Sequence, residues 1–184
     1  MQVFETHIQG VYVLTPKIFG DSRGYFLESF NQRVFNEAIG TDEFQFVQDN
    51  ESMSGKNVLR GLHFQAPPYD QGKLVRVIQG RVLDVVVDIR KSSKTYGQHF
   101  SIELNSEEKQ MLWIPPGMAH GFASLEDKTV FAYKCTQYYR PAAEGCVLWS
   151  DHDLNINWGI ENPTISEKDK LGEVFKDFES PFDN

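Results

Sequence analysis

The stretch at residues 74–89, LVRVIQGRVLDVVVDI, contains two runs of β-branched residues separated by Gln79 and Gly80. Val and Ile favour the extended backbone of a strand because their branched side chains pack well on a pleated surface. A short connection that contains glycine is typical of a tight hairpin turn. The stretch therefore predicts two strands, Leu74–Ile78 and Arg81–Ile89, that form a β-hairpin.

The rest of the chain repeats this short strand pattern on both sides. Alternation or β-branched and aromatic content predicts further strands at Val11–Leu14, Phe44–Gln48, Val58–Phe64, Phe100–Leu104, Met111–Ile114 and Thr129–Tyr139. Asn31 and Gly40 fit the two ends of a helix over Asn31–Ile39, and Thr164 with Glu167 has the spacing of a capping box. Many strands with two short peripheral helices predict a mainly β jelly roll or barrel whose interior can hold a ligand.

The composition is that of an ordinary globular protein. The 184 residues are 40% hydrophobic and 24% charged, without repeats or linker-like tracts, so we expect a single domain over residues 1–184. A formal net charge of −8 disfavours a nucleic-acid partner, although a few cations focused in one pocket can still bind a small anion. No apolar run is long enough to span a bilayer, and Met1–Gly10 lacks a signal pattern, so we expect a cytoplasmic protein with no membrane partner. Cys135 and Cys146 form no CxxC pair, and we interpret them as reduced packing residues.

A dense polar cluster interrupts an apolar strand at Asn57–Gln65, NVLRGLHFQ. Arg60 and His63 need partners or a wet pocket if this strand is buried. One interpretation is a hydrogen-bonded core histidine with a surface arginine, and the other is a functional pair. Strict alternation places the two side chains on opposite faces, so a shared site requires a bulge, for which Gly61 is the candidate.

A second histidine follows a turn in Trp113–Phe122, WIPPGMAHGF, where the pattern Pro-x-Gly-x-x-His ends at His120. This pattern resembles the second half of a cupin signature. A metal-binding cupin also carries a His-x-His pair, but the corresponding place here reads His63-Phe64-Gln65. Because that ligand set is incomplete, we expect no metal, and His63 is then available as a base near neutral pH.

A tyrosine is a candidate for the matching acid. Tyr133 and Tyr139 lie six residues apart in the predicted strand Thr129–Tyr139 and should share one face, with Tyr138 on the other. One of the pair can donate a proton while the other stacks on a ligand, or both simply pack. The residues alone leave this choice open.

Several longer motifs, in the same order, resemble the dTDP-4-dehydrorhamnose 3,5-epimerase family over nearly the whole chain. They are FGDSRGYFLE at 19–28, FVQDN at 46–50, LRGLHFQ at 59–65, GKLVR at 72–76, the run from Asp84 to Arg90 with Asp88, IPPGMAHGF at 114–122, the tyrosines at 133, 138 and 139 with Glu144 and Trp149, and SEKD at 166–169. The resemblance implies a cupin-type double-stranded β-helix, which is a jelly-roll barrel, in a homodimer. It also implies an isomerase that inverts C3 and C5 of dTDP-4-dehydro-6-deoxyglucose to give dTDP-4-dehydro-L-rhamnose, for cell-surface polysaccharides, without a metal or organic cofactor.

The resemblance also implies a role for each matching position. His63 would be the general base, Asp169 the carboxylate that orients it, Tyr133 the proton donor and Lys73 a cation near the enolate oxygen. Tyr139 would stack on the thymine ring. The substrate-binding positions would be Arg23, Phe26, Glu28, Gln48, Asp49, Asn50, Arg60, Lys73, His120, Tyr139, Glu144 and Lys168. In this family the N-terminal strands are exchanged across the dimer, so Arg23 and Glu28 would serve the partner's pocket.

The chemistry requires these residue types. A ketone at C4 acidifies the hydrogens on C3 and C5, so one base can remove either if a cation or donor stabilises the enolate oxygen. An acid on the opposite face returns the proton and inverts the carbon. Three alternatives stay open at this point: a related enzyme that inverts one carbon or isomerises the sugar, a non-catalytic cupin that binds sugar nucleotides, and a metal-dependent cupin.

Overall fold

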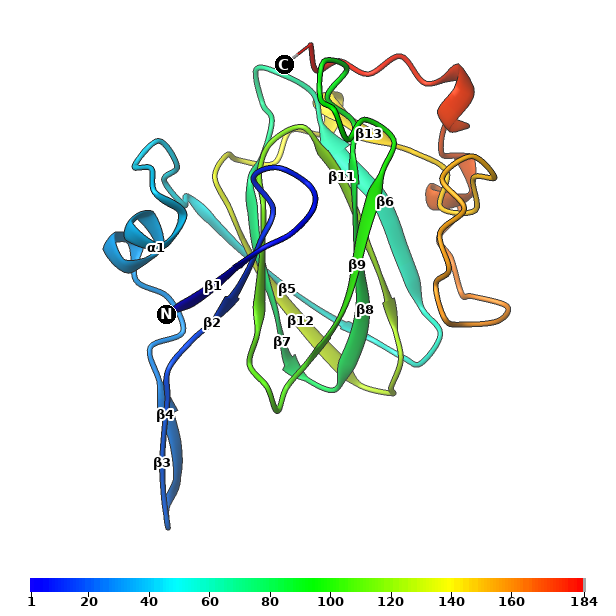
Figure 1. The fold of residues 1–184 in the computed structure, drawn as a ribbon. Coiled ribbons are helices and arrows are strands. Elements are labelled where there is room, and N and C mark those ends of the chain that lie inside the picture. Colours follow the sequence, from blue (N-terminus) through cyan, green and yellow to red (C-terminus); the bar gives the residue numbers. More distant parts are fainter. Residues whose placement is uncertain (184) are drawn as a thin grey trace.

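Two antiparallel sheets pack face to face in the computed structural model, which describes residues 1–183 (Figure 1). One sheet has six strands in the order β1-β2-β10-β7-β12-β5, and the other has five in the order β13-β6-β11-β8-β9. β3 and β4 form a separate two-stranded hairpin. The prediction of a mainly β, jelly-roll architecture is confirmed.

The bounds of the elements are as follows. The six-stranded sheet contains β1 (Gln2–Glu5), β2 (Tyr12–Thr15), β10 (Met111–Ile114), β7 (Lys73–Gln79), β12 (Thr129–Cys135) and β5 (Gln48–Ser54). The five-stranded sheet contains β13 (Glu144–Cys146), β6 (Leu59–Gln65), β11 (Met118–Ser124), β8 (Arg81–Asp88) and β9 (His99–Asn105). The remaining elements are β3 (Ile18–Asp21), β4 (Gly24–Leu27), α1 (Gln32–Ile39) and the 3-10 turns η1 (Pro141–Ala143), η2 (Asp169–Leu171) and η3 (Phe175–Asp177).

The strands predicted within residues 74–89 are confirmed as β7 and β8, but the predicted hairpin between them is wrong. β7 lies in the six-stranded sheet and β8 in the five-stranded sheet, so the chain turns a corner at Gly80 from one sheet to the other. Gly80 has a φ of 80°, and a Cβ there would lie 2.5 Å from Thr129 Oγ1. The glycine therefore serves a tight corner between sheets, which local sequence does not distinguish from a hairpin turn.

Two other strand predictions have wrong ends. Residues 44–47 precede β5, and Phe44 and Phe46 instead pack on Trp113, with ring centroids 4.9 and 5.9 Å from it. Their aromatic content reflects burial beside α1 rather than a sheet. β12 ends at Cys135, so the two tyrosines at 133 and 139 do not share a face of one strand.

One predicted helix is confirmed and the other is wrong. The side chain of Asn31 caps α1 by accepting from the N–H groups of Arg33 and Val34, and Gly40 ends it in the left-handed region. Thr164 instead forms a parallel bridge with Val58, because its N–H donates to the carbonyl oxygen of Asn57. The turn η2 begins after Ser166, whose Oγ accepts from the backbone N–H of Asp169.

The hydrophobic core occupies three layers. The first lies between the sheets and includes Val75, Val86 and Phe131. A second lies where the C-terminal segment covers the outer face of the five-stranded sheet, and a third lies where Phe35 of α1 packs against Trp113 on the other side (Figure 1). The sheets are therefore packed on each other and, over part of their outer faces, on the C-terminal segment and α1.

The β3–β4 hairpin projects away from both sheets (Figure 1). It exposes Phe19, Tyr25 and Phe26, and Phe26 is 68% exposed. Among residues 1–183, no helix has the length and apolar character needed to cross a membrane.

Candidate active site

A cavity of about 490 Å³ is lined by residues of both sheets and by the chain around η2. A neighbouring cavity of about 330 Å³ shares three of its lining side chains, His63, Lys73 and Tyr133. These three come from β6, β7 and β12. The two cavities therefore meet at a histidine, a lysine and a tyrosine supplied by separate strands.

A bulge in β6 brings both of its polar side chains to the larger cavity. In the ladder with β11, His63 lies opposite His120 and Arg60 lies opposite Phe122, so three steps along β6 match two along β11. Gly61 lies within this bulge at a φ of 125°, and a Cβ there would lie 2.5 Å from Gly121 Cα. The predicted bulge is confirmed, and both Arg60 and His63 line the cavity.

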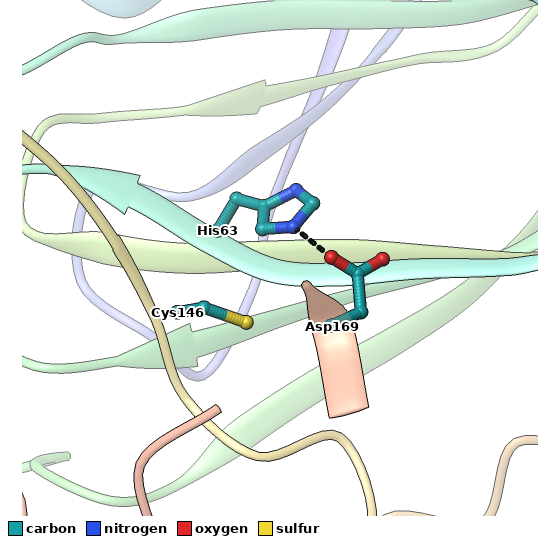
Figure 2. A group of neighbouring side chains, drawn as sticks. All are labelled: His63, Cys146 and Asp169. Carbon is teal, nitrogen blue, oxygen red and sulfur yellow. Dashed lines mark hydrogen bonds and ion pairs between the residues drawn. The ribbon is translucent and has the colours of Figure 1, made fainter. Parts of the chain in front are cut away.

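His63 is held by a buried carboxylate. Its Nε2 lies 2.7 Å from Asp169 Oδ1, and the Asp169 side chain is only 4% exposed (Figure 2). Burial opposes ionisation of Asp169, but its hydrogen bonds with His63 and with the Gly61 N–H lower its pKa below the usual value. The second ring nitrogen of His63 points away from Asp169 (Figure 2). An ionised Asp169 accepts from Nε2–H, which leaves the lone pair on Nδ1.

Lys73 and Tyr133 line the same two cavities, and burial shifts their pKa values in opposite directions. Burial lowers the pKa of the Lys73 ammonium, while the carboxylates of Glu144 and Asp84 act in the opposite direction. Burial raises the pKa of the Tyr133 hydroxyl, so that this group keeps its proton at neutral pH. The site thus brings together an imidazole, an amine and a phenol, which are the candidates for a base, a cation and a proton donor.

A second histidine–carboxylate pair lies beside the first. Nε2 of His120 is 3.0 and 3.1 Å from the two carboxylate oxygens of Asp84, which is completely buried. His120 lines the larger cavity and lies opposite His63 in the ladder. Sequence reasoning did not select Asp84 for the site. Its signal was a carboxylate in the middle of a valine-rich strand, because a buried carboxylate needs a hydrogen-bonding partner.

Glu144 connects the polar residues at the smaller cavity. Its Oε2 accepts from Tyr139 Oη at 2.6 Å and lies 2.5 Å from Lys168 Nζ. Burial acts against ionisation of Glu144, yet Lys168 and Tyr139 together lower its pKa. Gln48 accepts from the Tyr139 backbone N–H at 3.0 Å and donates to Asn50 Oδ1 at 3.0 Å. The predicted residues Gln48, Asn50, Tyr139 and Glu144 therefore lie around one space with Tyr133, although Tyr139 is beyond the end of β12.

Gln65 organises this end of the site and was not predicted as a site residue. Its Nε2 donates to the carbonyl oxygens of Tyr69 and Tyr138, at 2.6 and 3.3 Å. Its Oε1 accepts from the Arg140 N–H at 2.7 Å. The amide thus positions the segment that carries Tyr139. The available signal was its place two residues after His63, on the same face of β6.

Four predicted binding residues line neither of the two cavities of their own chain. Asp49 is on the opposite face of β5 from Asn50 and pairs with Lys134 Nζ at 2.8 Å. Arg23 and Phe26 are exposed on the β3–β4 hairpin. Glu28 follows the hairpin and accepts from Asn31 Nδ2 at 3.2 Å.

Three of the described residues form a group of potential metal ligands. One ligand atom from each of His63, Cys146 and Asp169 lies within 4.8 Å of the others (Figure 2). The expectation that the chain needs neither a metal nor an organic cofactor stays a prediction.

The chain is similar to several proteins named as dTDP-4-dehydrorhamnose 3,5-epimerases. The family model described as dTDP-4-dehydrorhamnose 3,5-epimerase matches residues 5–177. The dTDP-4-dehydrorhamnose 3,5-epimerase of Shigella flexneri is 52% identical over 177 residues, which are 96% of this chain and 97% of that protein.

Two solved structures show how far the likeness extends. The dTDP-6-deoxy-D-glucose-3,5-epimerase of Legionella pneumophila in complex with dTDP-4-keto-L-rhamnose has a TM-score of 0.91 and 44% identity, covering 95% of this chain and 93% of that one. A 3'-monoepimerase from Streptomyces bikiniensis in complex with dTDP-quinovose has a TM-score of 0.88 and 32% identity, covering 93% and 86%. The cupin-type jelly-roll fold is therefore shared between enzymes with different outcomes at the sugar.

Proposed function

The chain belongs to the dTDP-4-dehydrorhamnose 3,5-epimerase family, and we propose that it inverts C3 and C5 of dTDP-4-dehydro-6-deoxyglucose to give dTDP-4-dehydro-L-rhamnose. The observation that carries this proposal is the convergence of His63, Lys73 and Tyr133 on one space. A base, a cation and an acid are the groups that proton transfer next to a ketone requires. The ligand of the Legionella relative supports the substrate class.

His63 is the proposed general base. Asp169 accepts from Nε2–H at 2.7 Å, so the lone pair of the neutral ring is on Nδ1. The carboxylate also stabilises the imidazolium that forms when Nδ1 takes a proton from C3 or C5. The side chain is 28% exposed, which leaves one edge accessible to a ligand.

Lys73 and Tyr133 complete the proposed cycle. The electrons from the broken C–H bond move onto the C4 oxygen, where the Lys73 ammonium stabilises the enolate charge. Tyr133 then donates its proton to the carbon from the face opposite His63, which inverts that centre. Proton exchange with solvent then returns His63 to the neutral form and Tyr133 to the protonated form. Reorientation of the sugar ring between the steps lets the same pair serve both carbons.

The remaining cavity residues fit the nucleotide part of the substrate. Arg60 and Lys168 supply cations for a diphosphate, and both line the larger cavity with His120. Tyr139 presents an exposed ring at the smaller cavity, where stacking on thymine is the proposed role. Gln48 and Asn50 supply amide donors and acceptors there.

The β3–β4 hairpin is proposed to serve a second copy of the chain in a homodimer. The hairpin projects from the sheets and exposes aromatic side chains, which is unfavourable in water unless another surface covers them. Arg23 and Glu28 lie on or beside it, away from their own cavity. An exchanged hairpin accounts for both features, because Arg23 then contributes a cation to the partner's diphosphate site.

Product analysis tests the proposed function. The chain is incubated with dTDP-4-dehydro-6-deoxyglucose, and the configuration at C3 and C5 is read by NMR. Inversion at both carbons is expected. Inversion at C3 alone would move the chain toward the activity of the Streptomyces monoepimerase, and unchanged substrate in the presence of tight binding would instead indicate a non-catalytic cupin.

A further inference from the structure

Three side chains of different chemistry meet on the side of His63 that faces Asp169. One ligand atom each from His63, Cys146 and Asp169 lies within 4.8 Å of the others (Figure 2). The residues come from β6, β13 and η2, and Cys146 lies opposite His63 in the β13–β6 ladder. The sheet and the turn thus hold the three groups together without a ligand.

We propose that this cluster is an inhibitory zinc site, in which Zn²⁺ binds Nε2 of His63, Sγ of Cys146 and a carboxylate oxygen of Asp169. Zinc is bound in proteins by imidazole nitrogen, thiolate sulfur and carboxylate oxygen, at about 2.0–2.3 Å and in tetrahedral geometry. Ligand atoms around such an ion lie roughly 3–4 Å apart. Small side-chain movements are therefore enough to close the site, and a water molecule can take the fourth position.

Zinc at this place stops the proposed chemistry through the tautomer of His63. Without metal, an ionised Asp169 accepts from Nε2–H, and the neutral ring then carries its lone pair on Nδ1. Zinc takes the Nε2 lone pair, so the ring proton has to reside on Nδ1. The ring then has no lone pair with which to remove a substrate proton. Zinc also draws Asp169 away from its role as the acceptor for His63.

The state of Cys146 makes zinc binding release a proton. The Cys146 Sγ donates to the carbonyl oxygen of Val147 at 3.6 Å. A thiol that coordinates a metal loses its proton to the metal's charge, so each bound zinc should release one proton to solvent.

Binding is tested on the metal-free protein alone. Zinc is titrated in competition with a chromogenic chelator, and calorimetry in buffers of different ionisation enthalpy counts the protons. We expect one zinc per chain and release of one proton. Magnesium is the matched control and should not bind, because it requires oxygen ligands in octahedral geometry.

The inhibitory role of zinc rests on the proposed function, so it is tested by measuring turnover with and without zinc. Cys146→Ser and Cys146→Ala remove the thiolate, and Cys135→Ala is the control at the other free cysteine. Zinc should abolish the turnover of the native chain and of Cys135→Ala, and a chelator should restore the turnover of both. Both Cys146 variants should keep their metal-free turnover and bind zinc at least about 10- to 100-fold more weakly, the range that loss of an outer-shell partner already costs.

Equal zinc inhibition of the native chain and both Cys146 variants would overturn the site. Zinc bound without loss of turnover would overturn its inhibitory role. If the metal-free native chain shows no turnover at all, the proposed function fails, while the chelator competition still decides whether zinc binds at Cys146.

Discussion

His63 Nε2 and Asp169 Oδ1 lie 2.7 Å apart, although the two residues are separated by 106 positions in the sequence. The contact joins strand β6 of the five-stranded sheet to the 3-10 turn η2 near the end of the chain. It fixes which ring nitrogen holds the proton and therefore which one can accept another.

Asp169→Asn should lower kcat while changing KM little. A neutral amide can accept from or donate to Nε2, so it no longer enforces the tautomer with its lone pair on Nδ1. We expect kcat to fall at least about 10- to 100-fold. Steady-state kinetics measure both parameters, and Lys170→Ala in the same turn is the control, since Lys170 forms only an exposed ion pair with Glu167. A KM defect with unchanged kcat would indicate a substrate contact instead of a positioning role.

Tyr133→Phe should separate proton removal from inversion. The phenyl ring retains the packing but cannot return a proton to the carbon, and we expect epimerised product to form about 10²- to 10⁴-fold more slowly. His63 can still remove the proton and return one to the same face. In deuterium oxide, recovered substrate should therefore gain label with its configuration retained. Tyr138→Phe, at an exposed neighbouring tyrosine, should behave as the native chain. Normal inversion by Tyr133→Phe would exclude it as the acid.

Two defective chains should complement each other if the hairpin is exchanged. Arg23→Ala impairs the partner's site and His63→Ala impairs its own, so a mixed dimer contains one site with neither change. Equal mixing after reversible dissociation should restore about a quarter of native activity, because half of the dimers are mixed and each has one intact site. Mixing His63→Ala with Asp169→Asn is the control and should restore nothing, since both residues serve the same chain's cavity. No recovery with Arg23→Ala would place Arg23 outside the partner's site.

Asp88 should control stability in acid. It is completely buried and accepts from Arg90, Ser93 and Thr95. Burial opposes its ionisation, but these hydrogen bonds lower its pKa. A lowered folded-state pKa contributes stability above the unfolded value of about 3.9, and this contribution disappears as the pH falls through the folded value.

Asp88→Asn should therefore lower the free energy of unfolding by about 3 kcal/mol at neutral pH. It should also flatten the loss of stability in acid. Urea denaturation over a series of pH values measures both effects. Asp183→Asn, at an exposed partner of Lys91, should change little. A native-like acid dependence in Asp88→Asn would show that another carboxylate governs it.

Local sequence predicted the strands better than their partners. The valine-rich run became β8 because β-branched residues favour strands in any sheet. Gly80, however, turns the chain between sheets, and a glycine alone does not reveal which partner follows. The spacing of Thr164 and Glu167 predicts a helix cap. The backbone of Thr164 instead forms hydrogen bonds with residues more than a hundred positions earlier in the sequence. The strands β3 and β4 are exposed, so no buried face imposed an alternation that could be recognised.

For the candidate site too, residues that are neighbours in the sequence could be predicted together, whereas contacts between distant segments could not. Arg60, Gly61 and His63 are neighbours in the chain, so their motif and its bulge could be predicted together. The role of Asp169 as the partner of His63 could be predicted only through family resemblance, because no local sequence pattern links the two residues. Asp84 and Gln65 act through hydrogen bonds to other site segments, and these contacts exist only after the sheets have paired.

Solvent deuterium incorporation tests the central claim most directly. Native enzyme and His63→Ala are each incubated with dTDP-4-dehydro-6-deoxyglucose in deuterium oxide, and label at C3 and C5 is measured by NMR. The native chain should label both carbons, and His63→Ala should lose about 10²- to 10⁴-fold of the rate at both, because one base serves the two centres. Near-native labelling at either carbon by a folded His63→Ala protein would contradict the account.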